Sequence, residues 1–391
     1  MKEKFSPTEL ECLRLLWIAL NGNKEEDFVS VDWSALYHLF CQHCIEALPA
    51  DVISRLALPE DVRKSWGEQV IRQVFFCSSY RKVEARLFET LKFIPFCVLK
   101  GTAAAQYYPN QMYREMGDID LMVPEDEFEK ACDAMLASGW KDITQEQEAQ
   151  FGRHRSYEYA GVRVELHRFF AVTGTEEQKK ALDQLIIADI ELGRPYLHDS
   201  ENGLVLLSHI AQHLKAGIGL RQIVDWMMYV NKCMDDRVWE EDFREKAKAA
   251  GLDKLAVACT RMCQIYLGLR DNIRWCGEAD DDLCAELMNY IMKCGNFGRS
   301  RSFMESGAVS ALLEVPPLWK IREFFSYLQQ RGEKSWKSKN KYPFLKSVAW
   351  LRQLLHYAKI VCREKISVRS IKEMYAEGKR RRRIFGLIGQ K

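Results

Sequence analysis

The stretch that decides the fold reads Gly117-Asp118-Ile119-Asp120-Leu121-Met122-Val123, and Pro124 closes it. Residues 119–123 are typical of a short buried strand, which ends at the proline because proline cannot donate a ladder hydrogen bond. Side chains two positions apart on a strand point the same way, so Asp118 and Asp120 share a face while the apolar residues point into the core. Two carboxylates held this close repel each other. A hard divalent cation relieves that repulsion, because carboxylate oxygens are its natural ligands.

A second strand with the same alternation is predicted at residues 162–169. Its apolar face carries Val162, Val164 and Leu166, and its polar face carries Arg163, Glu165 and His167. If the two strands are neighbours, Glu165 becomes a third carboxylate beside the aspartates. Three carboxylates around two Mg²⁺ ions suit phosphoryl or nucleotidyl transfer, because one ion lowers the pKa of the attacking hydroxyl and the other neutralises the phosphates. We expect His167 to support this site rather than to catalyse.

A phosphate-binding turn is predicted upstream of the aspartates. The apolar run at residues 93–99 suits a buried strand, and a helix opens directly after Lys100-Gly101-Thr102. Glycine at a strand-to-helix turn lets the backbone approach a phosphate, and the helix N-terminus near Thr102 offers free N–H groups. Lys100 and Arg114 are nearby cations that suit phosphate, although a surface salt bridge is an equally good interpretation of either.

Three sequence blocks, in this order, carry a resemblance to a known family. They are Val98-Leu99-Lys100-Gly101-Thr102, Arg114-Glu115-Met116-Gly117-Asp118-Ile119-Asp120-Leu121-Met122-Val123 and Val164-Glu165-Leu166-His167. Together they resemble the uncharacterised bacterial nucleotidyltransferases, within the nucleotidyltransferase superfamily of the DNA polymerase β type. The pattern of that superfamily is a hydrophobic strand, a Gly-Ser or Gly-Gly turn, a D-x-D pair and a later acidic strand residue. This sequence departs from it at Thr102, where a hydroxyl is kept.

The resemblance implies an enzyme that binds two metal ions, Mg²⁺ or alternatively Mn²⁺, and an NTP such as ATP. It makes Asp118, Asp120 and Glu165 the metal ligands and the catalytic residues. It implies nucleotide binding by Lys100, Gly101, Thr102, Arg114 and Gly117. It extends to a helical segment after the core, where His213 would line the nucleotide pocket. In the same segment the resemblance also implies nucleotide binding by Arg221 and Asp225, which lie four residues apart on one helix face and could form a salt bridge. Helix packing is the alternative role for His213 and Asp225.

Two hypotheses about function follow. The first is a metal-dependent enzyme that transfers a nucleoside monophosphate from an NTP to an acceptor hydroxyl and releases pyrophosphate. The alternative is a catalytically idle module on the same fold that senses nucleotide or binds a partner. The net charge of only +2, from 57 basic and 55 acidic side chains, favours a small molecule or a protein side chain over RNA as the acceptor.

The expected fold class is α+β, with a small mixed β-sheet flanked by helical regions at both ends of the chain. Strand and helix patterns alternate as β-α-β-α-β-β in the middle, and helical periodicity dominates on either side. We expect an N-terminal helical region at residues 1–92, a nucleotidyltransferase core at 93–200, a C-terminal helical domain at 201–375 and a basic tail at 376–391.

Targeting signals and cysteine usage favour a cytoplasmic location. No apolar run reaches the ~20 residues that span a bilayer, so no transmembrane segment is expected. No apolar signal-peptide core follows the basic start of the chain. The thirteen cysteines are odd in number and scattered, which suits small buried side chains in a reducing compartment.

Two local motifs have alternative interpretations. Cys41-Gln42-His43-Cys44 is similar to half of a zinc site, but a tetrahedral site needs a second pair, and the helical pattern around it favours packing. The run Lys379-Arg380-Arg381-Arg382-Arg383 is typical of a solvated, mobile tail. Contact with RNA or with an anionic membrane surface is the alternative for this run.

Overall fold

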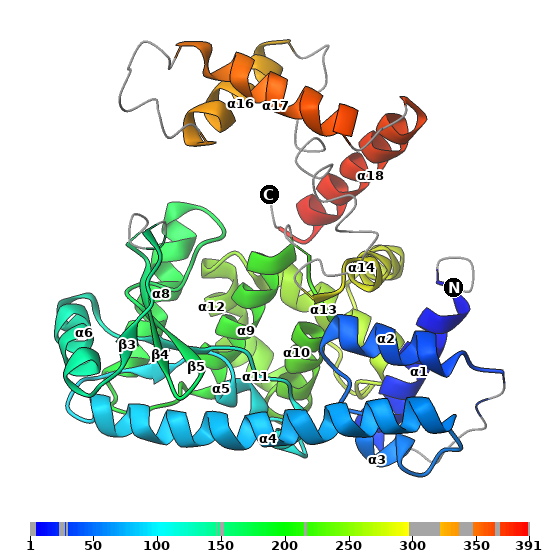
Figure 1. The fold of residues 1–391 in the computed structure, drawn as a ribbon, viewed down its shortest axis with the longest axis horizontal. Helices are drawn as coiled ribbons and strands as arrows, with labels where there is room; N and C mark the ends of the chain where they lie inside the picture. Colours follow the sequence, from blue (N-terminus) through cyan, green and yellow to red (C-terminus); the bar gives the residue numbers. More distant parts are fainter. Residues whose placement is uncertain are drawn as a thin grey trace. The chain divides into compact units, whose positions relative to one another are not determined.

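The computed structural model divides the chain into two compact units, of which the first holds the whole β-sheet (Figure 1). The model describes residues 5–22, 28, 30–146, 148, 152–214, 217–296, 321–335, 347–363 and 368–389. The first unit comprises Met1–Phe297 and Leu387–Lys391, and the second comprises Gly298–Gly386. Every residue that the sequence predicts for the site belongs to the first unit.

A five-stranded mixed sheet lies at the centre of the first unit. In spatial order its strands are β1 (Cys97–Val98), β2 (Ile119–Met122), β5 (Val162–His167), β4 (His154–Tyr159) and β3 (Lys141–Asp142). The β2–β5 pair is parallel, and the other three pairs are antiparallel. Parallel neighbours need a long crossover, and here it contains helix α6 (Phe128–Ala137) together with β3 and β4. The predicted α+β class with a small mixed sheet is confirmed.

The strands differ from their predicted lengths for local reasons. Only Cys97–Val98 of the predicted run 93–99 pairs as a strand, because Pro95 interrupts the run and has no N–H to donate. The chain nevertheless stays beside β2, since the Leu99 N–H donates to the Asp120 carbonyl at 2.9 Å. Helix α5 (Thr102–Ala105), which follows, is a single turn, so the helix N-terminus predicted there is short.

The β4–β5 hairpin is set by its two-residue turn. Ala160 and Gly161 have positive φ angles of 49° and 78°, as the tight turns that match the twist of paired strands require. Register then follows, with Tyr159 opposite Val162 and Ser156 opposite Glu165. The two-residue strand β3 at the edge was not predicted.

Helix α4 (Glu60–Leu91) connects the N-terminal helices to the sheet and runs along the base of the first unit in Figure 1. Its apolar face, with the inner faces of the strands and of α6, forms one buried cluster. From α4 this cluster contains Tyr80, Val83, Leu87 and Leu91, and from the sheet it contains Ile119, Leu121, Val164 and Leu166. The short 3₁₀ turns η1 (Gln111–Tyr113) and η2 (Glu125–Glu127) flank β2 in the chain.

Three helices precede α4. They are α1 (Pro7–Asn21), α2 (Trp33–His43) and α3 (Ala50–Ile53). Helix α1 begins directly after Ser6, because Ser6 and Glu9 form a reciprocal capping box. His43, at the end of α2, is fully buried, and its Nδ1 accepts a hydrogen bond from the Leu220 N–H at 3.1 Å. The segment that is similar to half of a zinc site therefore holds helices together.

The helices after the sheet complete the first unit. They are α8 (Glu176–Ile190), α9 (Asp199–Leu214), α10 (Leu220–Cys233), α11 (Asp236–Val238), the π-helical turn η3 (Trp239–Phe243), α12 (Arg244–Ala249), α13 (Asp253–Leu267) and α14 (Asp281–Cys294). Helices α9 and α10 are buried on almost every side, although both also bury polar residues, among them His209 on α9 and Asp225 on α10.

The second unit contains helices α16 (Ile321–Ser335), α17 (Ala349–Arg363) and most of α18 (Val368–Leu387). Helices α16 and α17 pack against each other. The basic run at residues 379–383 lies inside α18, because basic residues are good helix formers and the apolar residues after the run extend the helix. Among the described residues, no helix is both long and apolar enough to cross a membrane.

Candidate metal centre

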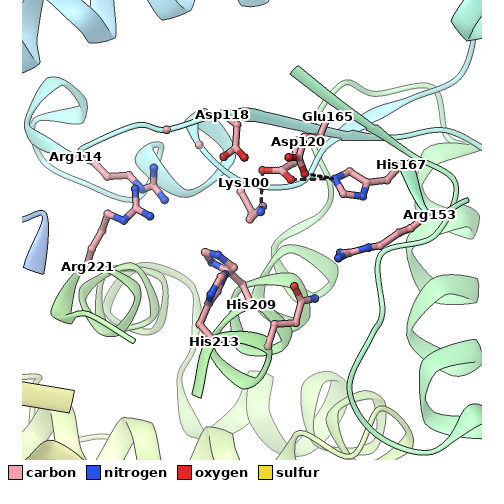
Figure 2. A pocket seen from close by; sticks show the side chains of 13 residues that line it. Lys100, Arg114, Asp118, Asp120, Arg153, Glu165, His167, His209, His213 and Arg221 are labelled. Carbon is pink, nitrogen blue, oxygen red and sulfur yellow. Dashed lines mark hydrogen bonds and ion pairs between the residues drawn. The ribbon is translucent and has the colours of Figure 1, made fainter. Parts of the chain in front are cut away.

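Three carboxylates meet where β2 and β5 run side by side. Asp120 lies directly opposite Glu165 in the parallel register, and Asp118 lies two residues before Asp120. One oxygen of each carboxylate lies within 4.8 Å of the others, and Figure 2 shows the three groups gathered on one wall of a cavity. The strands predicted to be neighbours are neighbours, and Glu165 joins the aspartates for that reason.

Asp120 is held between two nitrogen donors. Lys100 Nζ lies 2.8 Å from its Oδ2, and His167 Nε2 lies 3.0 Å from its Oδ1. Burial alone would raise the pKa of Asp120, but the lysine charge and the histidine hydrogen bond outweigh burial and hold this pKa well below its usual range. His167 itself is buried, which lowers its pKa to about 4.

The other two carboxylates are compensated less fully, although Arg163 Nη2 lies 3.0 Å from Glu165 Oε1. The charge of Asp120 and burial together raise the pKa of Asp118. Burial, followed by the charges of Asp120 and Asp118, raises the pKa of Glu165 to about 7. The cluster therefore holds more negative charge than its lysine neutralises. A divalent cation would correct that imbalance, and these residues fit one.

The cavity in front of the carboxylates has a volume of about 240 Å³. Its lining is charged, polar or glycine throughout and consists of Lys100, Gly101, Arg114, Gly117, Asp118, Asp120, Arg153, Glu165, His167, His209, Gln212, His213 and Arg221. In Figure 2 the carboxylates face the histidines of α9, while Arg114 and Arg221 lie at one side and Arg153 at the other. This arrangement suits a ligand that carries both a metal and several negative charges.

The predicted phosphate turn is divided between the cavity and the interior. Gly101 lines the cavity with a φ of +67°, and a Cβ there would lie 2.7 Å from the Tyr80 hydroxyl, so only glycine fits. Thr102 is buried, and its hydroxyl donates to Glu84 instead of facing the cavity. Gly117 lines the cavity beside Asp118 and has open space around its Cα.

The predicted Arg221–Asp225 salt bridge is wrong. Asp225 instead accepts two hydrogen bonds from Arg114, both of 2.8 Å, and one from the Tyr108 hydroxyl at 2.7 Å. Arg221 turns the other way and donates to the Glu115 carbonyl at 3.1 Å. The planar guanidinium of Arg114 matches the buried carboxylate well, because its Nε and Nη2 donate in parallel to the two oxygens of Asp225. Asp225 therefore braces the core against α10.

Sequence reasoning missed several cavity residues. Arg153 donates to the Phe170 carbonyl at 2.9 Å, and its buried Nε has no hydrogen-bond partner among the described residues. Arg221, which was predicted to bind nucleotide, lies at the opposite side and has a buried Nε in the same condition. Two such donors facing one cavity suit a ligand with anionic oxygens. No local pattern marks Arg153, because it reaches the cavity from the residue before β4.

His209 was missed although its sequence position carried a signal. It lies one helical turn before His213 on α9, and the two rings lie 4.6 Å apart. Burial, reinforced by the charge of Lys100, lowers the pKa of His209 well below its usual range and that of His213 to about 4. Both rings are therefore neutral at pH 7 and can form hydrogen bonds with a ligand without repelling a metal ion.

A mixed sheet that gathers carboxylates opposite arginines and neutral histidines is the architecture of an enzyme that handles phosphate groups. A family model described as "Uncharacterised nucleotidyltransferase" matches residues 29–268, and the chain therefore belongs to that family. The resemblance to the uncharacterised nucleotidyltransferases, predicted from the three sequence blocks, is confirmed at the level of this family. Membership supports a general role in nucleotidyl transfer, with an NTP as substrate. Neither the curated proteins nor the solved structures contain a match.

Proposed function

We propose that the protein transfers a nucleoside monophosphate from an NTP to a hydroxyl group of an acceptor and releases pyrophosphate. The observation that carries this proposal is the meeting of Asp118, Asp120 and Glu165 across the β2–β5 register, within a cavity whose other walls are cationic or neutral. The order of glycine turn, D-x-D pair and later acidic strand residue further supports membership of the DNA polymerase β type superfamily.

The three carboxylates are the residues that would hold two Mg²⁺ ions, with Mn²⁺ as the alternative. Their mutual repulsion, seen in the raised pKa values of Asp118 and Glu165, is the feature that cation binding would remove. Bound there, the ions would supply Lewis acidity to the acceptor hydroxyl and to the phosphates. Glu165 would complete the site and help to orient the acceptor hydroxyl.

The cationic side chains would hold the triphosphate. Lys100 lies beside Asp120, so it can bind a phosphate oxygen next to the metal site. Arg221 and Arg153 have buried Nε–H groups available from opposite sides of the cavity, and Gly101 lets the backbone approach closely. Arg114, Gly117 and His213 also line the cavity, while Thr102 and Asp225 would act by shaping it. A small molecule or a protein side chain remains our proposed acceptor.

The test removes both aspartates. In the Asp118→Asn/Asp120→Asn variant, Mg²⁺-dependent NTP binding and pyrophosphate release should fall below detection, because no ligand pair remains for the ions. Calorimetry with each NTP measures binding. An enzyme-coupled pyrophosphate assay on small hydroxyl compounds, proteins and RNA measures turnover. Asp133→Asn on α6, an exposed carboxylate of the same unit, is the matched control and should change neither.

One observation favours a second candidate, the catalytically idle module. Lys100 already neutralises part of Asp120, and in a module that never turns over this ion pair would simply persist. Such a module predicts metal-dependent NTP binding in the wild type without pyrophosphate release on any acceptor. Unchanged transfer in the double aspartate variant would contradict the proposed mechanism itself.

A further inference from the structure

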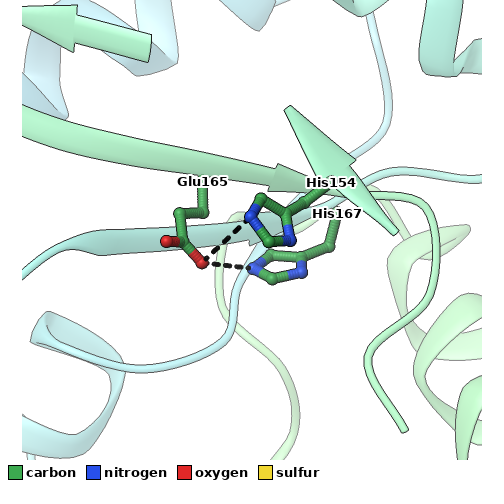
Figure 3. Close-up of side chains that lie close together, drawn as sticks. All are labelled: His154, Glu165 and His167. Carbon is green, nitrogen blue, oxygen red and sulfur yellow. Dashed lines mark ion pairs between the residues drawn. The ribbon is translucent and has the colours of Figure 1, made fainter. Parts of the chain in front are cut away.

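Strand β4 places the imidazole of His154 on the same face of the sheet as the carboxylates and beside the imidazole of His167 on β5. In the antiparallel β4–β5 pair His154 lies directly opposite His167, and Glu165 lies two residues before His167 on the same strand. Side chains in these positions project from one face of a sheet. Figure 3 shows both imidazole rings directed at the carboxylate of Glu165.

The distances in this group fit a metal ion better than they fit hydrogen bonds. His167 Nε2 lies 3.6 Å and His154 Nε2 lies 3.8 Å from the same Oε2 of Glu165. Both separations are longer than a hydrogen bond. Ligand atoms about 2.0–2.1 Å from a tetrahedral ion lie about 3.3 Å from one another, so a small contraction of the observed group encloses one ion. Asp120 Oδ1 is hydrogen-bonded to His167 Nε2 at 3.0 Å, and it offers a fourth ligand atom when the ring carries its proton on Nδ1 and Nε2 binds the ion.

The ring nitrogens supply an independent reason to expect a ligand. Both nitrogens of His154 and Nδ1 of His167 are buried, and they have no hydrogen-bond partner among the described residues. A buried polar atom without a partner is unfavourable, so an ion bound at His154 Nε2 would stabilise the group. The side chain of His154 is 15% exposed, so the group can exchange an ion with solvent.

We propose that His154, His167 and Glu165, with Asp120, form a metal site that takes a first-row transition cation, Mn²⁺ or Zn²⁺, in preference to Mg²⁺. Imidazole nitrogen combined with carboxylate oxygen suits these cations, whereas Mg²⁺ prefers oxygen ligands alone. Glu165 belongs to this site and to the Asp118–Asp120–Glu165 cluster, so it bridges the two. If the proposed function holds, the transfer reaction would use one Mg²⁺ ion at the carboxylate cluster and one transition cation at the histidine site.

The experiment is direct metal binding to the metal-free full-length protein, titrated separately with MnCl₂, ZnCl₂ and MgCl₂ in a calorimeter. His154→Gln should weaken Mn²⁺ or Zn²⁺ on the order of a hundredfold, because a ligand is lost, and leave Mg²⁺ binding in place. Asp118→Asn should give the reverse pattern. His38→Gln, an exposed histidine on α2, is the matched control and should change neither.

A spectroscopic measurement on the wild type makes the test independent of variant folding. Mn²⁺ bound at this site should show electron-spin-echo modulation from imidazole nitrogen, and the signal should survive Asp118→Asn. Equal Mn²⁺ and Zn²⁺ affinity in the wild type and His154→Gln, or bound Mn²⁺ without a nitrogen signal, would overturn the proposal. Pyrophosphate release that fails while the nitrogen-dependent binding persists would instead overturn the proposed function and leave the metal site standing.

Discussion

The first unit contains two buried ion pairs with the same formal charges and different surroundings. Arg114 and Asp225 are joined by two parallel hydrogen bonds, and their side chains are only 3% and 2% exposed. Lys100 and Asp120 share one contact of 2.8 Å, and the lysine side chain is 16% exposed on the cavity wall. Both cations line the cavity, but we call the Arg114–Asp225 pair closed because it is almost fully buried and the Lys100–Asp120 pair open because its lysine is exposed to whatever enters the cavity.

The chemistry of the two cations matches these surroundings. A guanidinium donates in a fixed fork and holds a carboxylate in one geometry, so Arg114 ties the segment before β2 to α10. An ammonium group is a compact charge on a flexible stem, so Lys100 can release Asp120 when a stronger cation arrives. We therefore interpret the closed pair as a structural brace and the open pair as an exchangeable one.

The largest expected effect comes from breaking the brace. Arg114→Met leaves the Asp225 carboxylate buried without its cation, which should lower the free energy of unfolding by about 3–5 kcal/mol. Equilibrium unfolding in urea measures the change. Replacing both partners, as in Arg114→Met/Asp225→Leu, removes the isolated charge and should recover much of the loss. A single variant within about 1 kcal/mol of the wild type would show that the pair is no brace.

Opening the exchangeable pair should alter function more than stability. Lys100→Met removes a proposed phosphate contact, so kcat/KM for nucleotidyl transfer should fall on the order of a hundredfold. Without NTP, the same variant should bind Mg²⁺ about tenfold more tightly, since a positive charge beside Asp120 has gone. Lys130→Met, which removes an exposed lysine on α6, is the control. Weaker Mg²⁺ binding in Lys100→Met would contradict the idea that lysine and metal compete for Asp120.

The carboxylate cluster was predictable because strand alternation is a local property. Positions two apart on β2 share a face whatever surrounds them, and the same rule places Glu165 and His167 together on β5. Whether β2 and β5 pair could not be predicted from either strand alone, because pairing depends on the whole fold. The helical regions were also predictable, since their apolar periodicity is local, although β3, with two exposed residues, gave no such signal.

The partners of the ion pairs were not predictable, because they depend on contacts between distant segments. Arg221 and Asp225 are close in sequence, yet Asp225 binds an arginine that lies 111 positions earlier in the chain. Arg153 and His154 come from the start of β4, and only the β4–β5 register brings them to the site. Helix spacing shows which residues on one helix can form an ion pair, whereas the free energy of burial in the folded protein determines which pair forms.

Helix α10 is also held by a contact that involves no charged group, which can be compared with the Arg114–Asp225 ion pair on the same helix. His43 accepts a hydrogen bond from the Leu220 N–H, and burial lowers its pKa from 6.5 to about 4. The unfolded chain takes up a proton near pH 6.5 while folded His43 remains neutral, so stability falls as the pH drops from 6.5 towards 4. Between pH 7 and pH 5.5 this group should cost about 1 kcal/mol of unfolding free energy.

The change that isolates this effect is His43→Gln, because a glutamine oxygen can still accept the Leu220 N–H but does not titrate in this range. The pH dependence of urea unfolding should be shallower in the variant than in the wild type, and His38→Gln should leave it unchanged. Burial would lower the pKa of Arg114, but the charge of Asp225 outweighs it, so Arg114 stays charged at both pH values. The loss of unfolding free energy caused by Arg114→Met should therefore be the same at pH 7 and pH 5.5. Equal slopes in the wild type and His43→Gln would mean that His43 is protonated in the folded protein, and the charge-free brace on α10 would then have to be abandoned.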